Sequence, residues 1–211
     1  MDEQTSGYLT YAELNAKVIY EKITKNRALF LCIDTLDFKK NNNEPNPKVK
    51  IRSCIYDDTK PAGERILSEI DTFIPIGRFL LLAHNILSGV YAKEQRSDKK
   101  PKEYFTQYGG SYGPPVISTK FSIVDGNKNN AHFSLLSQSC SGVKTAKGAI
   151  LPSHEGASGA EQKTVIISMT DDELKEFCLI GKAYIEQYIS LDIRARLATI
   201  HEQKKNLHIK E

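Results

Sequence analysis

The stretch from Thr164 to about Tyr188 constrains the fold most, because an apolar segment changes there directly into a helical pattern. "TVIISM" (164–169) is rich in β-branched residues, as buried strands are. Thr170 and Glu173 then form the S/T-x-x-E pattern of a helix capping box. Apolar and small residues follow at helical spacing, namely Leu174, Phe177, Gly181, Tyr184 and Tyr188. The chain is therefore expected to pass from a strand straight into a long amphipathic helix.

Three further extended segments precede this strand. "VISTKFSIVDG" (116–126) alternates, with Ile117, Phe121 and Ile123 on one face and Ser118, Lys120 and Ser122 on the other. "DGNKNN" predicts a turn, "AHFSLLSQSCSG" (131–142) a second strand and "GAILPS" (148–153) a third, before the loop "HEGASGAEQK". Strands joined in this way predict an antiparallel sheet.

The first half of the chain shows a similar order. Thr10 and Glu13 form another capping box, from which a helix is predicted to about Lys25. "RALFLCIDTLDF" (27–38) and "KVKIRSCIY" (48–56) indicate two strands separated by an Asn- and Pro-rich loop. "SEIDTFIPIG" (68–77) predicts another strand, which leads into the apolar helix "GRFLLLAHNILSGV" with Gly89 as its stop.

Residues 93–115 are charged and then rich in Gly and Pro, which predicts a linker between units 1–92 and 116–211. Each half then holds strands followed by one apolar helix. We therefore expect an α+β fold with two β-β-β-β-α units, related by internal duplication, and an N-terminal helix. The alternative is one α+β domain whose halves resemble each other by chance, since residue identity between them is low.

Composition excludes several classes of protein. The net charge is only +3, so a polyanion site would need local clustering of cations. Cys32, Cys54, Cys140 and Cys178 form no CxxC or Cys/His cluster, and the histidines show no metal spacing, so no metal or disulfide framework is expected. The first residues lack a signal-peptide pattern and no apolar run approaches ~20 residues, so we expect a cytoplasmic protein.

The expected order of elements resembles that of the Whirly, PUR and positive cofactor four group of single-stranded nucleic-acid-binding folds, in a form where two units pack as a pseudo-dimer. The resemblance covers most of residues 27 to 190 at the level of element order. It implies that the chain binds single-stranded nucleic acid. The resemblance includes no sequence motif, because the lysine-glycine-lysine strand of plant Whirly proteins and the PUR repeat consensus are both absent. No binding residue is therefore assigned from it.

Candidate binding residues come from the strand pattern instead. If Val49, Ile51, Ser53 and Ile55 face the core, the opposite face carries a row of cations ending in an aromatic residue: Lys48, Lys50, Arg52 and Tyr56. Cations on alternate residues suit a phosphate backbone, and the ring offers a base a stacking surface. The alternative is a solvated strand face whose charges block aggregation.

A second outward row is expected in the second half of the chain. Its members are Lys120, Ser122, His132 and Ser134, with Lys144 and Lys147 in the next segment. The predicted linker adds Tyr104, Phe105, Tyr108 and Tyr112 beside Lys99, Lys100 and Lys102, an interleaving of aromatics and cations that single-strand binders use. These aromatics would equally serve to pin the segment to its own domain.

Sequence motifs give no support to catalysis. Ser141 and Lys144 match S-x-x-K, but the SDN and KTG partners of that motif are absent, as are the Gly-rich phosphate loops. We therefore expect no enzyme and no cofactor. The leading hypothesis is a sequence-tolerant single-stranded DNA- or RNA-binding protein. The second is an interaction or structural protein that forms homodimers through its helices, which acidic residues mixed into the basic face would favour. The third is a hydrolase around His132, Ser141 and Lys144.

Overall fold

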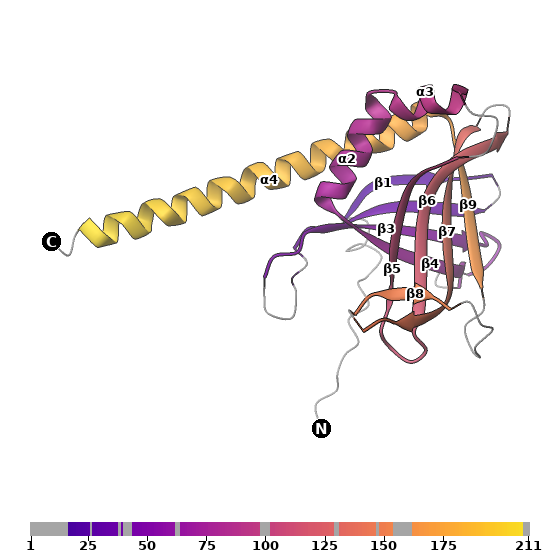
Figure 1. Ribbon diagram of the computed structural model, residues 1–211, viewed down its shortest axis with the longest axis horizontal. Coiled ribbons are helices and arrows are strands. Elements are labelled where there is room, and N and C mark those ends of the chain that lie inside the picture. Colours follow the sequence, from indigo (N-terminus) through magenta and orange to yellow (C-terminus); the bar gives the residue numbers. More distant parts are fainter. Residues whose placement is uncertain are drawn as a thin grey trace.

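The computed structural model shows an α+β protein with two antiparallel sheets, of four and five strands, and a long C-terminal helix (Figure 1). It describes residues 17–25, 27–37, 39, 44–61, 64–97, 102–128, 131–146, 148–153 and 162–208. The first half contains β1 (Val18–Ile23), β2 (Ala28–Thr35), β3 (Lys48–Tyr56), β4 (Ile66–Pro75), α2 (Ile76–Leu87) and α3 (Val90–Ser97). The second half contains β5 (Glu103–Ser111), β6 (Ile117–Lys128), β7 (Ala131–Lys144), β8 (Ile150–Pro152), β9 (Lys163–Met169) and α4 (Asp171–His208).

The first sheet is an antiparallel meander in the order β1-β2-β3-β4. The second has the order β5-β6-β7-β8, and β9 pairs with β7. Strand β7 pairs with three strands: with β6 along most of its length, with β9 over Phe133–Ser139 and with β8 over Gly142–Lys144. The short strand β8 places Ile150 against Gly110 and Gly142, where an added Cβ would come within 3.0 Å and 2.8 Å of the Ile150 side chain. Glycine at these positions thus lets Ile150 pack on the sheet.

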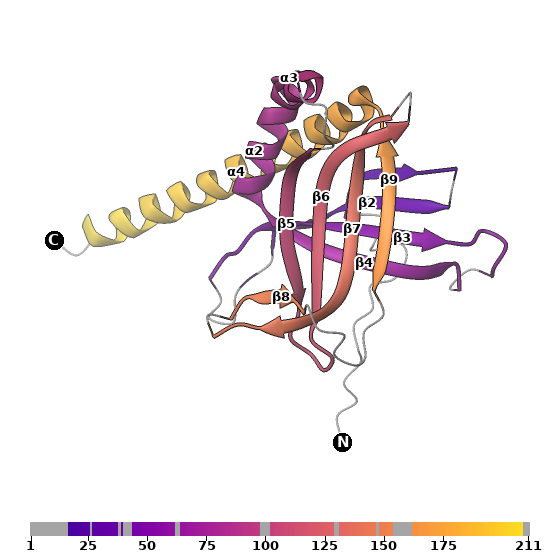
Figure 2. The same ribbon diagram turned by 45° about the vertical axis from the view of Figure 1, so that its right-hand side comes forward.

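The two sheets pack face to face, and their strands run across each other (Figure 2). One continuous core joins residues of both halves, with Phe30 of β2 stacked on Phe121 of β6 at a centroid distance of 6.3 Å. Two buried hydroxyl pairs also bridge the sheets. Ser53 and Ser137 lie 2.8 Å apart, and Thr72 donates to Thr119 over 3.3 Å. Because these polar groups satisfy each other, they can be buried between the sheets at little cost.

Helices α2 and α4 lie side by side and cover one end of this core (Figure 1). The ring of Phe177 in α4 meets that of Phe79 in α2 edge to face, at 5.4 Å. Helix α2 ends as expected, with Gly89 in the left-handed region at φ 72° and its N–H donating to the carbonyl of Ile86. None of the helices in the described part of the chain is long and apolar enough to cross a membrane.

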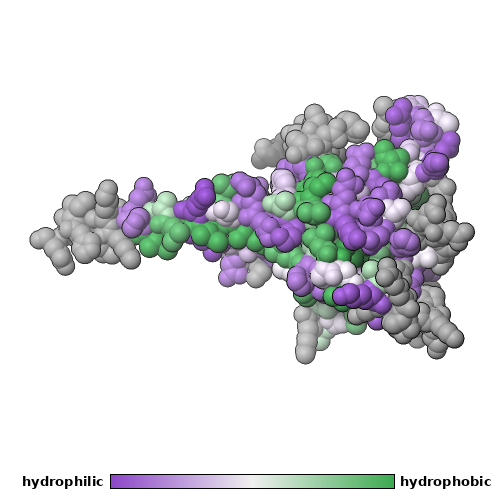
Figure 3. Space-filling view, turned by 90° about the horizontal axis from the view of Figure 1, so that it is seen from above, coloured by the Kyte–Doolittle hydropathy of each residue, from purple (hydrophilic) through white to green (hydrophobic). Residues whose placement is uncertain are grey.

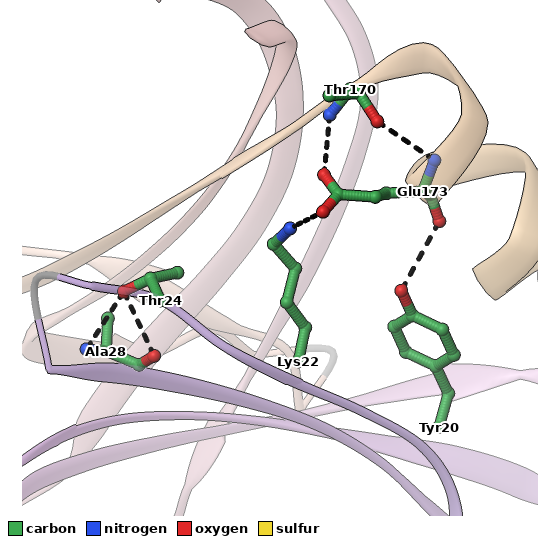
Figure 4. A network of polar contacts seen from close by, with 6 residues as sticks. All are labelled: Tyr20, Lys22, Thr24, Ala28, Thr170 and Glu173. Carbon is green, nitrogen blue, oxygen red and sulfur yellow. Dashed lines mark hydrogen bonds and ion pairs between the residues drawn. The ribbon is translucent and has the colours of Figure 1, made fainter.

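The predicted capping box at the start of α4 is confirmed (Figure 4). The Glu173 N–H donates to Thr170 Oγ over 3.2 Å, and the Thr170 N–H donates to the Glu173 carboxylate over 2.8 Å. The cap is also tied to the first sheet, because Lys22 of β1 donates to the same carboxylate. Burial opposes the charged form of Glu173, but the bonds from Lys22 and Thr170 outweigh it and lower its pKa. The junction between β9 and α4 is therefore anchored to both sheets.

Two sequence-based expectations are wrong. The helix predicted from Thr10 to Lys25 is not formed at Val18–Ile23, which is strand β1; residues 1–16 lie outside the described part. The pairing of β1 with β2 and the burial of Tyr20 override the helical spacing. The predicted linker is also structured. It contains most of α3 and the whole of β5, which pairs with β6 from Glu103 to Ser111.

Candidate nucleic-acid interface

The basic row on β3 faces outward, but two of its cations, Lys50 and Arg52, are already paired with carboxylates of β4. Arg52 lies opposite Asp71 of β4 and donates from Nε and Nη2 to the two carboxylate oxygens, each over 2.8 Å. The guanidinium also lies 3.2 Å from Glu69, and Lys50 Nζ lies 3.3 Å from Asp71. Two cations and two carboxylates thus form one cross-strand network.

The network is half-buried, which strengthens the pairing. The Lys50 and Arg52 side chains are only 16% and 17% exposed. Burial opposes the charged form of Asp71, but the hydrogen bonds and charges of Arg52 and Lys50 outweigh it and hold its pKa below the ordinary value. The hydrogen bonds that Arg52 donates to Asp71 raise the pKa of Arg52 in turn. Lys50 and Arg52 therefore lie on the outer face, as the alternation predicts, but Glu69 and Asp71 compensate their charges.

Lys48 and Tyr56 are the two ends of the row, and both are partly buried. Lys48 is half-buried at the first position of β3, and its carbonyl accepts from Thr35 Oγ over 2.7 Å. Tyr56 follows an irregularity in the β3–β4 register after Ile55, which is itself exposed rather than in the core. Acidic residues interleaved with the cations favour the interaction hypothesis on this face. The alternation of Glu69, Asp71 and Phe73 in "SEIDTFIPIG" is the sequence signal that places the carboxylates there.

On the outer face of the second sheet, Tyr108 of β5 and Lys120 of β6 lie opposite each other. The ammonium group of Lys120 is 6.0 Å from the centroid of the Tyr108 ring, which is 49% exposed. Lys120 also forms an ion pair of 3.1 Å with Glu103, whose carboxylate accepts from Ser122 over 2.9 Å. This pair therefore offers an open aromatic ring next to a cation whose charge is partly compensated.

A second lysine and tyrosine meet beyond the end of β5. Lys144 Nζ, at the end of β7, is 5.1 Å from the centroid of the Tyr112 ring, which is 58% exposed. The Tyr112 hydroxyl donates to the carbonyl of Gly148, so the hairpin between β7 and β8 holds the ring in place. We call Tyr108, Tyr112, Lys120 and Lys144 the tyrosine-lysine surface.

A cleft of about 630 Å³ opens between β4 and the second sheet, next to this surface. Ser111, which directly precedes Tyr112, lines it together with Ser139 and Cys140 of β7 and Lys163 of β9. Glu69 and Asp71 line its opposite side. The lining thus combines hydroxyl groups, one lysine and two carboxylates with apolar side chains such as Phe73 and Ile117, and no single charge dominates it.

The other predicted binding residues lie elsewhere. The Tyr104 ring packs between Tyr91 and Phe133, at centroid distances of 5.1 Å and 5.6 Å, and its hydroxyl donates to Asp125. Phe105 is buried in the core. His132 is exposed near the opposite end of β7 from Lys144, and Lys147 lies outside the described residues. Of the four aromatic residues predicted in this segment, Tyr104 and Phe105 are therefore packed, whereas Tyr108 and Tyr112 are exposed.

The hydrolase alternative lacks the geometry that it needs. His132 and Ser141 are nine residues apart on the same strand, about 30 Å along an extended chain, whereas a base must lie within hydrogen-bond reach of its nucleophile. Within the part of the chain that the structure describes, no group of three or more His, Cys, Asp or Glu side chains is placed to hold a metal ion.

We compared the chain with protein-family models, with curated proteins and with solved structures, and none of the three comparisons finds a match.

Proposed function

We propose that this protein binds single-stranded DNA or RNA without catalysis and with little sequence preference, through the tyrosine-lysine surface. The observation that carries the proposal is the pairing of two exposed tyrosine rings with two lysines at one end of the second sheet. Every base has a face that stacks on an aromatic ring, and a neighbouring ammonium group can contact the phosphate. The bases of one strand would stack on Tyr108 and Tyr112, which are four residues apart, about 13 Å along an extended chain.

The order of elements supports the same proposal. Strands β1 to β4 lead into α2, and β5, β6, β7 and β9 lead into α4, with α3 and the short β8 as additions. We propose that these are two related β-β-β-β-α units, arranged as in a Whirly-like pseudo-dimer. We place the proposed site on the second unit, because Lys50 and Arg52 on the outer face of the first unit are engaged by Glu69 and Asp71.

The test is a fluorescence anisotropy titration with labelled single-stranded oligonucleotides of different composition at two salt concentrations. Replacing Tyr108 or Tyr112 by Ala should weaken binding by about 1 to 3 kcal/mol and leave the salt dependence nearly unchanged. Lys144→Ala should instead reduce the slope of log affinity against log salt by ~0.7, the value for one phosphate contact of a single strand.

Tyr184→Ala and Lys93→Ala are the matched controls, since both side chains are exposed on helices rather than on the second sheet. Absence of binding at low salt, or equal losses in the control variants, would refute the proposal.

A further inference from the structure

Helix α4 extends beyond the body of the protein and carries apolar side chains into solvent. Its first half is packed, with Leu174, Phe177 and Ile185 fully buried. Its second half projects away from both sheets (Figure 1), and a band of apolar surface runs along it (Figure 3). In this half Leu191, Ile193, Leu197 and Ile200 are 47% to 59% exposed. A projecting helix with contiguous exposed apolar residues indicates a surface that another molecule covers.

Three of these residues form one stripe with the spacing of a coiled coil. Ile193, Leu197 and Ile200 follow one another at intervals of four and three residues, as successive core positions of a heptad do. When the heptad spacing is extended toward the N-terminus, the core positions are occupied by Ser190, Glu186 and Ala183, all of which are exposed. When the spacing is extended toward the C-terminus, the core positions are occupied by Lys204 and Leu207. Leu191 is on a different face of the helix, because two residues correspond to a rotation of about 200°.

The charges within the stripe point to its occupant. Glu186 and Lys204 both occupy core positions of the heptad, one on each side of the apolar centre. Two parallel copies in register would place Glu186 against Glu186 and Lys204 against Lys204. Two antiparallel copies can instead place Ile193 against the partner's Leu197, Ser190 against the partner's Ile200 and Ala183 against the partner's Leu207. The same register places Glu186 against the partner's Lys204.

We propose that α4 pairs with α4 of a second copy of this chain, antiparallel and in this register. The contact is isologous, so each complementary layer occurs twice about a two-fold axis between Ile193 and Leu197. From Ala183 to Leu207 the overlap is about 36 Å long. Glu186 is available to the partner, because its ion pair with Lys182 is an exposed contact between neighbouring turns, of the kind that contributes little.

The test uses light scattering and sedimentation of the full chain over a range of concentrations. Leu197→Lys should convert the dimer to a monomer with unchanged circular dichroism, since the side chain is exposed in the monomer. Leu191→Lys is the matched control, because it adds the same charge on another face of α4 and should leave the dimer intact.

Charge reversal tests the register. Glu186→Lys or Lys204→Glu alone should raise the dissociation constant about tenfold or more, because two layers each gain a like-charge pair. The double variant should restore the affinity of the natural chain. A natural chain that stays monomeric, equal effects of Leu191→Lys and Leu197→Lys, or a double variant that does not recover would each overturn the proposal. A dimer that resists every change in the stripe would place the contact on a surface other than this stripe.

Discussion

Arg52 of β3 and Asp71 of β4 hold each other through two parallel hydrogen bonds of 2.8 Å on the outer face of the first sheet. Asp71→Ala would leave Arg52 and Lys50 half-buried without their main counter-charge. We expect the free energy of unfolding to fall by about 2 to 3 kcal/mol, as for the loss of charged hydrogen bonds. Urea denaturation at pH 7 measures this.

Asp58→Ala provides the comparison for this prediction. Asp58 makes an ion pair of 3.2 Å with Arg27, but its side chain is 63% exposed. Exposed pairs contribute about 0 to 1 kcal/mol, so the variant should unfold near the urea concentration of the natural chain. Equal effects of the two substitutions would show that the Arg52–Asp71 network is no stronger than a surface ion pair.

The same carboxylate predicts how stability depends on pH. The pKa of Asp71 is lower in the folded protein than its unfolded value of about 3.9. Its contribution is therefore fully present above that unfolded pKa and is lost as pH falls through the lower native pKa. Asp71→Asn removes this dependence. The stability difference between the natural chain and this variant should thus be constant near neutral pH and shrink below about pH 4. Urea midpoints between pH 7 and pH 2 test it, and a difference independent of pH would contradict it.

The cap of α4 predicts a separate effect on stability. Thr170→Ala removes the acceptor for the Glu173 N–H, and the free energy of unfolding should fall by about 0.5 to 2 kcal/mol. Thr199→Ala is the control, because Thr199 is exposed on the same helix and donates only to the carbonyl of Ala195. Alanine has the higher helix propensity, so this control should lose no stability. Indistinguishable denaturation midpoints for the two variants would show that the cap contributes nothing.

Sequence patterns predicted local features of this fold well and long-range ones poorly. The capping box at Thr170, the stop at Gly89 and most strands are determined by neighbouring residues, and the structure confirms them. Strand β1 was predicted as a helix, because its pairing with β2 and the burial of Tyr20 depend on residues that are distant in sequence. Strand β5 has two glycines near its end and was predicted as a linker for the same reason.

The candidate site shows the same limit. Alternation along β3 correctly indicated that Lys50 and Arg52 face outward. The alternation carried no information about the neighbouring strand β4, which brings Asp71 into register with Arg52 and compensates the charges of Lys50 and Arg52. The surface that remains depends on pairs formed across strands, Tyr108 with Lys120 and Tyr112 with Lys144. All four were predicted from the sequence as candidate binding residues, but which tyrosine meets which lysine depends on how the strands pair in the sheet.

The contact between α4 and α2 depends on a residue without a side chain. A Cβ on Gly181 would come within 2.4 Å of the Phe79 ring, far closer than atoms pack. Gly181→Ala should therefore cost about 1 to 3 kcal/mol through overpacking, partly offset by the roughly 1 kcal/mol by which Ala favours a helix over Gly. Ala195→Gly, at an exposed position of α4 outside the apolar stripe, isolates that propensity effect. Thermal denaturation compares the variants, and a stabilised Gly181→Ala would show that the helices can move apart freely.

The four cysteines differ in burial, which predicts how they react with a thiol reagent. Cys32, Cys54 and Cys178 are completely buried. Burial raises the pKa of all three thiols, to about 12 for Cys54 and Cys178, so they form almost no thiolate at pH 8. Cys140 is partly exposed and lines the cleft beside β4. We therefore expect one thiol per chain to react quickly with Ellman's reagent under native conditions and all four in urea. Cys140→Ser should abolish the fast phase. A fast phase that persists in this variant would mean that one of the buried thiols reaches solvent in the native state.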